Sequence, residues 1–412
     1  MNHFVQSIRV NKLLHLENFD IDIPAASPHL IITGKNGSGK TVLLKALADF
    51  LELVKNNKRL DFTKLKSHVI DAQQKLEASK DAEHQLQYKN SVAYWSKEYD
   101  KYYSKAYIEF VDLYKVAELI QQDDFILAFY PAERKPQMIE PNNPIKPNLP
   151  KDRKVKDLLT NQFLFFLADL KVQEALARNE GQSKDADDIK QWFDGFESIL
   201  KDIYNDQELR LEFNYKNYSF TIKTGGKQFK FTEMSDGFIA AIDIIADLIL
   251  KMQNENSITR VYQKKGIVLI DEIETHLHLE LQRIVLPILI RIFPNVQFIV
   301  TTHSPFVLSS MENAVAYDLE QHEHITDLTE YSYEALAEGF FGVKVESSYM
   351  EMRLDSLRNL LNKDELTEVE KAQVANLVSD FDKISEVASP SIFGQYMHLK
   401  VKYSEKFNAL IK

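Results

Sequence analysis

The stretch Gly34-Lys-Asn-Gly-Ser-Gly-Lys-Thr41 constrains the fold of this chain more than any other segment. It matches the pattern G-x-x-x-x-G-K-[ST], in which glycines let backbone N–H groups converge on an anion where a helix begins. The chain has only 12 glycines, yet three of them fall between positions 34 and 39. A buried run, His29 to Thr33, precedes the loop, and a helical pattern of apolar residues follows it. The sequence therefore predicts a strand, a phosphate-binding loop and a helix rather than an incidental glycine-rich turn.

The side chains of this loop have distinct expected roles. Lys40 is expected to reach the β- and γ-phosphates of ATP, and the Thr41 hydroxyl is expected to hold Mg²⁺. The residues expected to surround the phosphates with backbone N–H groups are Asn36, Gly37, Ser38 and Gly39. The predicted cofactors are therefore ATP and Mg²⁺.

A second motif joins a buried strand to two carboxylates. Residues 267–270 are four apolar β-formers that run directly into Asp271 and Glu272. In an open parallel sheet these carboxylates lie beyond the carboxyl ends of the strands, where such sheets bind ligands. Asp271 is expected to bind Mg²⁺ through water. Glu272, which strand alternation would place on the opposite face, is expected to orient and deprotonate the attacking water.

Two histidine-containing segments follow. Glu274, His276 and His278 extend the acidic stretch and raise a zinc or dinuclear site as an alternative, but their spacing is not that of a zinc-binding H-E-x-x-H pair. The next buried strand, 296–300, ends in Thr-Thr-His303-Ser-Pro. If this strand neighbours the acidic one, His303 can hydrogen-bond a γ-phosphate, and we favour that role over a structural one.

The wider pattern predicts an α/β fold with a mixed, mostly parallel central sheet. A hairpin should turn at Gly225-Gly226, a helix should begin at Phe238, and a capping box should start a helix at Thr367. Prolines at 141–150 indicate an extended spacer, with a partner-docking motif as the alternative. The predicted divisions are 1–54 (N-terminal core with the phosphate loop), 55–204 (mostly helical insertions with two core strands at about 104–130), 205–320 (C-terminal core) and 321–412 (helical).

Composition narrows the remaining possibilities. The formal net charge is −11, which argues against a long, uniform DNA-binding face. The absence of cysteine rules out disulfides and Cys-ligated zinc and fits a reducing cytosol. The most apolar helix-length run, 238–250, contains two aspartates, and the N-terminus lacks an apolar signal core. We therefore expect a cytoplasmic protein with no membrane partner.

Four segments in this order, GKNGSGKT, MSDGF, LIDEIETHLH and TTHSP, resemble those of ABC-type ATPase heads of the RecF/SMC/OLD branch. The resemblance covers about residues 1–54 and 205–320. It implies a P-loop NTPase head with N-terminal antiparallel strands, helical insertions and a helical C-terminal region. The compact form with ETHLH and TTHSP looks like ATPases of bacterial anti-phage systems, such as Septu PtuA, retron-associated ATPases and the PARIS ATPase AriA.

In that family two heads sandwich two ATP molecules, so the resemblance implies a homodimer or a higher homo-oligomer. The signature motif of one head faces the phosphate loop of the other. Carried across, Ser235, Asp236 and Gly237 would bind the γ-phosphate of the partner's ATP. His303 matches the family's switch histidine. The chain departs from the common pattern at Asp236, where transporters have glycine, and at Ile273, where proline is common.

The resemblance further implies a Mg²⁺-dependent ATPase that senses nucleotide and regulates an anti-phage complex with a separately encoded nuclease or toxin. The one D-x-D after the switch histidine, Asp380-Phe381-Asp382, lies in a helix-period run that turns its carboxylates apart, so we find no nuclease site. The family's Q-loop glutamine has a candidate in Gln137, beside Arg134. The alternatives are a RecF-like DNA-repair ATPase and a non-hydrolysing scaffold. Lysine- and arginine-rich segments at 55–66 and 146–156 leave DNA binding open, although solvated helix faces are the plainer interpretation.

Overall fold

The computed structural model describes residues 3–253, 264–325, 333–341, 348–383 and 390–407, except positions 58, 136, 151, 364 and 405. Lys58 and Lys151, which belong to the two basic segments, lie outside the described residues. The chain divides into two compact units, Met1–Tyr333 and Glu334–Lys412. Among the described residues, no helix is long and apolar enough to cross a membrane.

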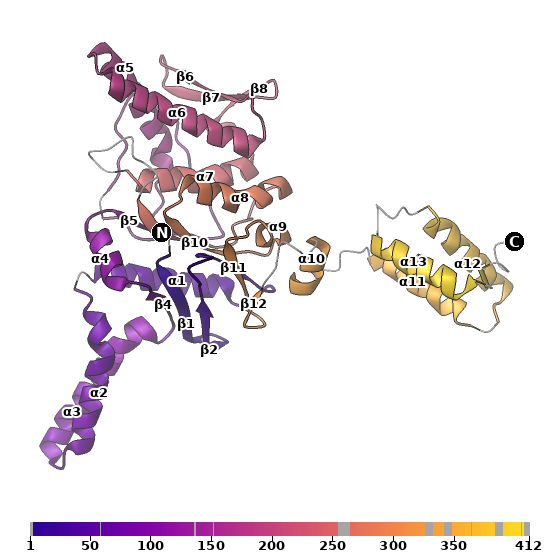
Figure 1. The fold of residues 1–412 in the computed structure, drawn as a ribbon, viewed down its shortest axis with the longest axis horizontal. Helices are drawn as coiled ribbons and strands as arrows, with labels where there is room; N and C mark the ends of the chain where they lie inside the picture. The colour runs from indigo at the N-terminus through magenta and orange to yellow at the C-terminus, as the bar shows by residue number, and fades with distance from the viewer. Residues whose placement is uncertain are drawn as a thin grey trace. The chain divides into compact units, whose positions relative to one another are not determined.

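The first unit is built on a six-stranded sheet (Figure 1). Its strands in spatial order are β12 (Glu323–Ile325), β11 (Ala314–Asp318), β3 (His29–Thr33), β10 (Val296–Thr301), β9 (Lys265–Ile270) and β5 (Phe125–Tyr130). All neighbouring pairs are parallel except β11 with β12. The central strands are buried along their whole length, which explains why they appear in the sequence as continuous apolar runs. The predicted mixed, mostly parallel sheet is confirmed.

Helices cover both faces of this sheet (Figure 1). The helix that follows the phosphate loop, α1 (Lys40–Asn56), packs on one face, and α7 (Asp236–Lys251) and α8 (Leu279–Ile292) lie on the other. Almost every residue of α7 is buried, including Asp243 and Asp247. A helix buried on all sides belongs to the core, so its position is set by packing rather than by solvent.

Two smaller antiparallel sheets and further helices complete the unit. The predicted hairpin at Gly225-Gly226 is confirmed, because Thr224 pairs with Lys227. The strands of the small sheets are β1 (Val5–Leu13), β2 (Leu16–Asp22) and β4 (Ala106–Phe110) in one, and β6 (Arg210–Asn214), β7 (Ser219–Thr224) and β8 (Lys227–Lys230) in the other. The helices are α2 (Leu65–Ala78), α3 (Ala82–Tyr103), α4 (Leu113–Gln121), α5 (Phe163–Asn179), α6 (Ser183–Tyr204) and α9 (Pro305–Leu308).

The helix expected from Phe238 begins two residues earlier, at Asp236. Ser235 has the extended backbone of a helix N-cap, with φ −68° and ψ 154°, and its carbonyl accepts the first helical hydrogen bond from Ile239 N at 3.0 Å. The prediction was wrong because Ser235 and Asp236 were treated as a turn in front of the helix. They are its cap and first residue.

The second unit contains α11 (Ser348–Leu361), α12 (Glu368–Phe381) and α13 (Pro390–Lys402), which share one apolar core. It also contains α10 (Tyr333–Phe341), except for the first residue of that helix, which is the last residue of the first unit. The capping box at Thr367 and Glu370 is present as predicted. Asp380 pairs with Arg353 of α11, whereas Asp382 pairs with Lys400 of α13 at 2.5 Å. The two carboxylates therefore serve as separate links between helices.

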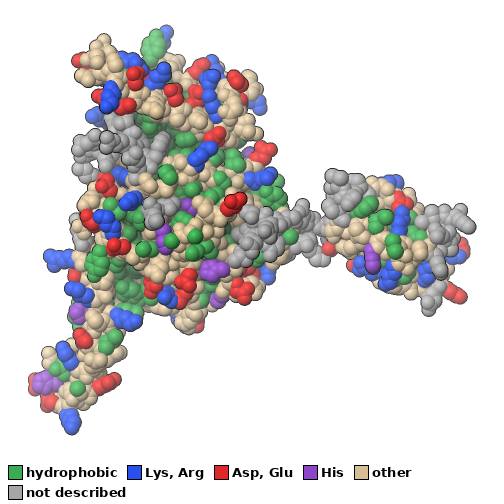
Figure 2. Space-filling model, in the orientation of Figure 1, with side chains coloured by type: hydrophobic (Ala, Val, Ile, Leu, Met, Phe, Trp, Pro, Cys, Tyr) green, Lys and Arg blue, Asp and Glu red, His purple; other side chains and the backbone are tan. Residues whose placement is uncertain are grey.

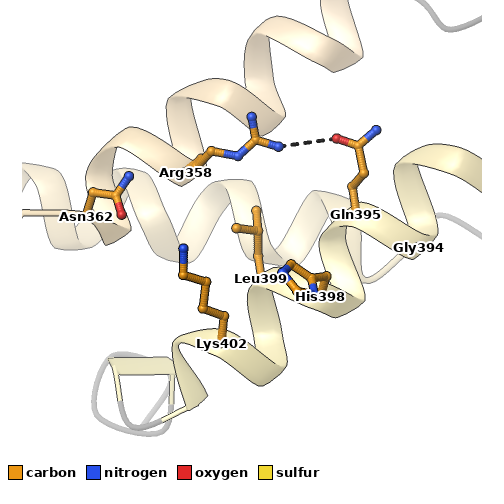
Figure 3. A pocket seen from close by; sticks show the side chains of 7 residues that line it. All are labelled: Arg358, Asn362, Gly394, Gln395, His398, Leu399 and Lys402. Atoms are coloured by element: carbon orange, nitrogen blue, oxygen red, sulfur yellow. Dashed lines mark hydrogen bonds between the residues drawn. The ribbon is translucent and has the colours of Figure 1, made fainter.

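This unit also has a hollow of about 420 Å³ between α11 and α13 (Figure 3). Arg358 points across it and donates a hydrogen bond to Gln395 at 3.3 Å. The other lining residues are Asn362, Gly394, His398, Leu399 and Lys402. None of the residues that the sequence predicts for a functional site lines this hollow.

The described surface mixes charges of both signs. In Figure 2 basic and acidic side chains are interspersed over the visible face rather than gathered by sign. Within the second basic segment, Lys156 pairs with Asp49 of α1 at 2.8 Å. The charge of this lysine is therefore balanced locally.

Gly266 marks a close approach between β9 and β5. A Cβ at this position would lie 2.3 Å from Ile126 Cγ1 and 2.7 Å from Ile126 O. We predict that Gly266→Ala lowers the free energy of unfolding by about 1–3 kcal/mol, because the two strands must separate to admit the methyl group. In α6, a methyl group at Gly195 would meet nothing within 4 Å, so Gly195→Ala should raise that free energy by about 0.5–1 kcal/mol. Urea denaturation measures both variants, and equal effects would contradict the packing argument.

Candidate functional site

The phosphate loop follows β3 and has three glycines in the left-handed region. Gly34, Gly37 and Gly39 have φ of +134°, +85° and +97°. At Gly39 a Cβ would also lie 2.8 Å from Leu16 Cδ1 of β2. Glycine is therefore required for the chain to pass closely beneath this strand and to begin α1 at Lys40.

The Lys40 ammonium group is folded back into the loop. Its Nζ donates to Gly34 O at 2.7 Å, to Lys35 O at 3.0 Å and to Ser38 Oγ at 3.3 Å. Burial lowers the pKa of Lys40 to about 8, although Glu272 and other carboxylates oppose this shift. The loop thus holds a buried cation whose hydrogen bonds are made entirely by the loop itself.

The acidic strand end meets the phosphate loop directly. Asp271 is fully buried, and its Oδ1 accepts hydrogen bonds from Thr41 Oγ1 at 3.2 Å and from Thr301 Oγ1 at 2.7 Å. Among the described residues, Asp271 Oδ2 is buried without a hydrogen-bond partner. A carboxylate oxygen and a threonine hydroxyl are hard oxygen ligands, so this pair fits Mg²⁺. Thr41 and Asp271 are the two residues that the sequence predicts to hold Mg²⁺.

Glu272 adopts a conformation that few residues other than glycine take. Its φ is 44°, a left-handed value that costs of order 1–3 kcal/mol and persists only where its surroundings impose it. Two side chains do so: Thr301 Oγ1 accepts from Glu272 N at 2.7 Å, and Arg134 Nη2 donates to Glu272 O at 3.4 Å. The Glu272 carboxylate accepts from Thr275 Oγ1 at 3.3 Å. Glu272 therefore does not continue the alternation of β9, as the sequence suggested, but turns away from the strand.

Glu274 holds in place the loop that contains Thr302 and His303, here called the histidine loop. Its two carboxylate oxygens accept from His303 N at 2.5 Å and from Thr302 Oγ1 at 2.8 Å. Burial raises the pKa of Glu274. Burial and the charge of Lys40 lower the pKa of the His303 imidazole to about 4, so this ring is neutral at neutral pH and carries one N–H donor. β10 neighbours β9, as expected.

The signature segment lies at the N-terminus of α7. Ser235 and Asp236 are exposed, whereas Gly237 is buried. A Cβ at Gly237 would lie 2.9 Å from His278 Cδ2 and 3.0 Å from His276 O, so the segment packs tightly on the ETHLH stretch. In the described part of the chain, no hydrogen bond or ion pair joins these three residues to the phosphate loop. The two halves of the predicted phosphate site are thus not joined within one chain.

Several residues that shape the site were missed or misread from the sequence. His15 contacts the loop through its ring Nε2, which lies 3.1 Å from Ser38 O. Thr301 and Glu274 act through hydrogen bonds between turns that are remote in sequence. Arg134 was noticed only as a neighbour of Gln137, which is exposed in the structure. The sequence offered only two signals for these residues: a threonine before the Thr-His-Ser-Pro turn and a lone arginine after an apolar strand.

Comparison with known proteins places this architecture in a family. A model described as "AAA domain, putative AbiEii toxin, Type IV TA system" (AAA_21) matches residues 30–309, more than half of the chain. The chain belongs to the AAA_21 family. The matched segment of this AAA_21 protein runs from β3 through the phosphate loop, signature and acidic turn to the histidine loop.

Individual relatives of this AAA_21 protein were also found. Septu protein PtuA of Bacillus mycoides is 24% identical over 99% of this chain and 56% of that protein. PtuA of Bacillus thuringiensis is 30% identical over 38% of this chain and 40% of that protein, and a retron Ec83 probable ATPase of Escherichia coli is 42% identical over 20% and 15%. The chain thus spans about half the length, or less, of the curated relatives it matches. A crystal structure of an Smc head bound to a ScpA winged-helix domain aligns with 78% of this chain and 96% of that one, at 12% identity and a TM-score of 0.35.

The lowered pKa of Lys40 generates a test of the phosphate loop. Phosphate charge offsets the burial that lowers this pKa to about 8, so ligand binding should return a proton to Lys40 above that pH. We predict uptake of close to one proton when ATP binds at pH 9, almost none at pH 7, and weaker binding as the pH rises past about 8. Calorimetry in two buffers with different ionisation enthalpies measures this uptake. Lys40→Met should show none; equal uptake at both pH values, or uptake that persists in Lys40→Met, would contradict the assignment.

Proposed function

We propose that this chain binds and hydrolyses ATP as a Mg²⁺-dependent, dimeric switch in the bacterial cytoplasm. We further propose that it serves anti-phage defence by controlling a separately encoded nuclease or other effector. The observation that carries this proposal is the hydrogen bond between Thr41 and Asp271, 230 residues apart, which joins the phosphate loop to the acidic turn. Membership in AAA_21 supports nucleotide binding.

The chemistry follows from the side chains at this edge of the sheet. Backbone N–H groups of Asn36 to Thr41 and the Lys40 ammonium group would hold the phosphates. Mg²⁺, held by Thr41 and Asp271, would supply positive charge to the phosphoryl group during transfer. Glu272 would position a water molecule and take its proton, and neutral His303 would donate a hydrogen bond to the γ-phosphate.

A second chain would complete each site. Among the described residues, Ser235, Asp236 and Gly237 make no hydrogen bond or ion pair with their own phosphate loop, and two of them are exposed. In the proposed dimer these residues face the nucleotide of the partner chain, and the N-terminus of α7 adds its positive end. Closure of the dimer would then depend on bound ATP, and hydrolysis of that ATP would let the two chains separate again.

The setting in defence rests on the relatives. A Septu PtuA aligns with nearly the whole chain, and two retron probable ATPases align with shorter parts of it. The RecF/SMC/OLD resemblance adds that compact ATPases of this kind act with an effector encoded by a separate gene. We propose the same division of work here, with this chain as the nucleotide-dependent regulator.

The role proposed for Glu272 predicts a trapped state. Glu272→Gln should lower the turnover number for ATP by on the order of 100-fold or more, because the amide cannot accept the proton of water. ATP binding should persist, and light scattering after gel filtration with ATP and Mg²⁺ should show stable dimers. Hydrolysis at the wild-type rate would show that another group is the base.

A mixing experiment tests the composite site. Ser235→Arg and Lys40→Ala chains should each lack ATPase activity. Mixed in equal amounts they should recover up to about a quarter of wild-type activity, since half of the dimers then have one intact site of two. Subunit exchange is checked with two different affinity tags. No recovery in confirmed mixed dimers would contradict independent composite sites.

A further inference from the structure

A buried arginine contacts the backbone of the acidic turn, at Asp271 and Glu272. Arg134 follows β5 and is 3% exposed. Its Nη1 donates to Pro131 O at 3.0 Å and to Asp271 O at 3.1 Å, and its Nη2 donates to Glu272 O at 3.4 Å. One planar guanidinium thus spans the backbone of both carboxylate residues, and its fork geometry restricts where that backbone can lie.

The signature helix carries a buried carboxylate, Asp243, which forms no direct ion pair with Arg134. Asp243 of α7 is 1% exposed, and its two carboxylate oxygens are buried without a hydrogen-bond partner among the described residues, as is Arg134 Nε. Burial lowers the pKa of Arg134, and Asp243 opposes this more than Glu274, Asp271 or Glu272 does. The charge of Asp243 therefore offsets part of the cost of burying the Arg134 guanidinium.

The helix that carries Asp243 is rigidly held. Asp243 is six positions after Gly237, so it lies roughly 9 Å along α7 from the signature. One turn further, Asp247 accepts from Tyr130 Oη at 2.6 Å and pairs with Lys251 at 2.6 Å. Tyr130 is the last residue of β5, and its carbonyl accepts from Asp271 N at 2.8 Å. Buried polar contacts therefore run from α7 to the acidic turn.

We propose that Arg134 is a positioning residue that couples the signature helix to the hydrolytic turn of the same chain. It holds Glu272 in its left-handed conformation through the backbone carbonyl. The hydrogen bonds from Tyr130 Oη to Asp247 and from Asp271 N to Tyr130 O tie the same turn to α7. This inference rests on the proposed function, because it gives Glu272 its role. When the signature engages a partner's nucleotide, a shift of α7 would be transmitted through Asp247 and Tyr130 to the turn that Arg134 holds, and so to the carboxylate that activates water.

The test is a double-mutant cycle with Arg134→Met, Tyr130→Phe, which removes the hydroxyl group that contacts Asp247, and the combined variant. Arg134→Met should lower kcat on the order of 10- to 100-fold, because a displacement of about 1 Å at a catalytic group has that effect. The KM for ATP and the binding of a fluorescent ATP analogue should stay within about threefold of wild type. Arg134→Lys keeps the charge but not the fork and should restore part of the loss. The combined variant should lose less than the product of the single effects.

Arg153→Met is the matched control. Arg153 is a partly buried arginine near α7, but it donates to Leu250 O at 3.4 Å, near the far end of that helix. Its removal should lower the unfolding midpoint without changing kcat. An Arg134→Met chain with normal kcat would overturn the inference, as would losses of stability and ATP binding that account for the whole loss of activity.

The inference and the proposed function can fail separately. If the wild-type chain does not hydrolyse ATP, or if Glu272→Gln hydrolyses it normally, the proposed function fails. The coupling of Arg134 with Tyr130 is then still measured in the ligand-free chain by urea denaturation of the same four proteins. Strictly additive free energies of unfolding would overturn this coupling whatever the activity.

Discussion

The hydroxyl group of Thr301 is the contact on which the proposed catalytic edge depends. It donates to Asp271 Oδ1 and accepts from Glu272 N, both at 2.7 Å, while the Thr301 carbonyl accepts from Ile273 N at 3.1 Å. Three consecutive residues after β9 are thereby fixed to the last residue of β10. Since Thr301 is fully buried, water cannot replace these bonds, and any loss would leave polar groups unpaired.

Strand order explains why one threonine can do this. β10 lies between β3 and β9 and is parallel to both, so the phosphate loop, the histidine loop and the acidic turn leave the sheet at the same edge. The carboxyl ends of neighbouring parallel strands are about 5 Å apart, which is within reach of short side chains. Thr41, Glu274 and Thr302 then join the three turns without any long side chain.

Much of this arrangement could be predicted because it is local in sequence. The geometry of a glycine-rich turn between a strand and a helix is determined within ten residues of sequence. The same holds for an apolar strand that ends in two acidic residues. The conformation of Glu272 could not be predicted, since its left-handed φ is imposed by Thr301 and Arg134 from other strands. Asp243 was likewise noticed only as a charge in an apolar helix. The hydrogen bond that joins β5 to the same helix, from Tyr130 to Asp247, is visible only once the two elements are packed.

The hydrogen bonds of Lys40 have a consequence for which anions the loop accepts. The lysine is already satisfied by Gly34, Lys35 and Ser38, so a ligand gains only the difference between its own contacts and those it displaces. A single phosphate group offers little more than the carbonyl oxygens do. A polyphosphate chain with a divalent cation brings several contacts at once and shifts the exchange in its favour. Because Lys40 is already hydrogen-bonded within the loop, abundant small anions gain too little on binding to displace those hydrogen bonds.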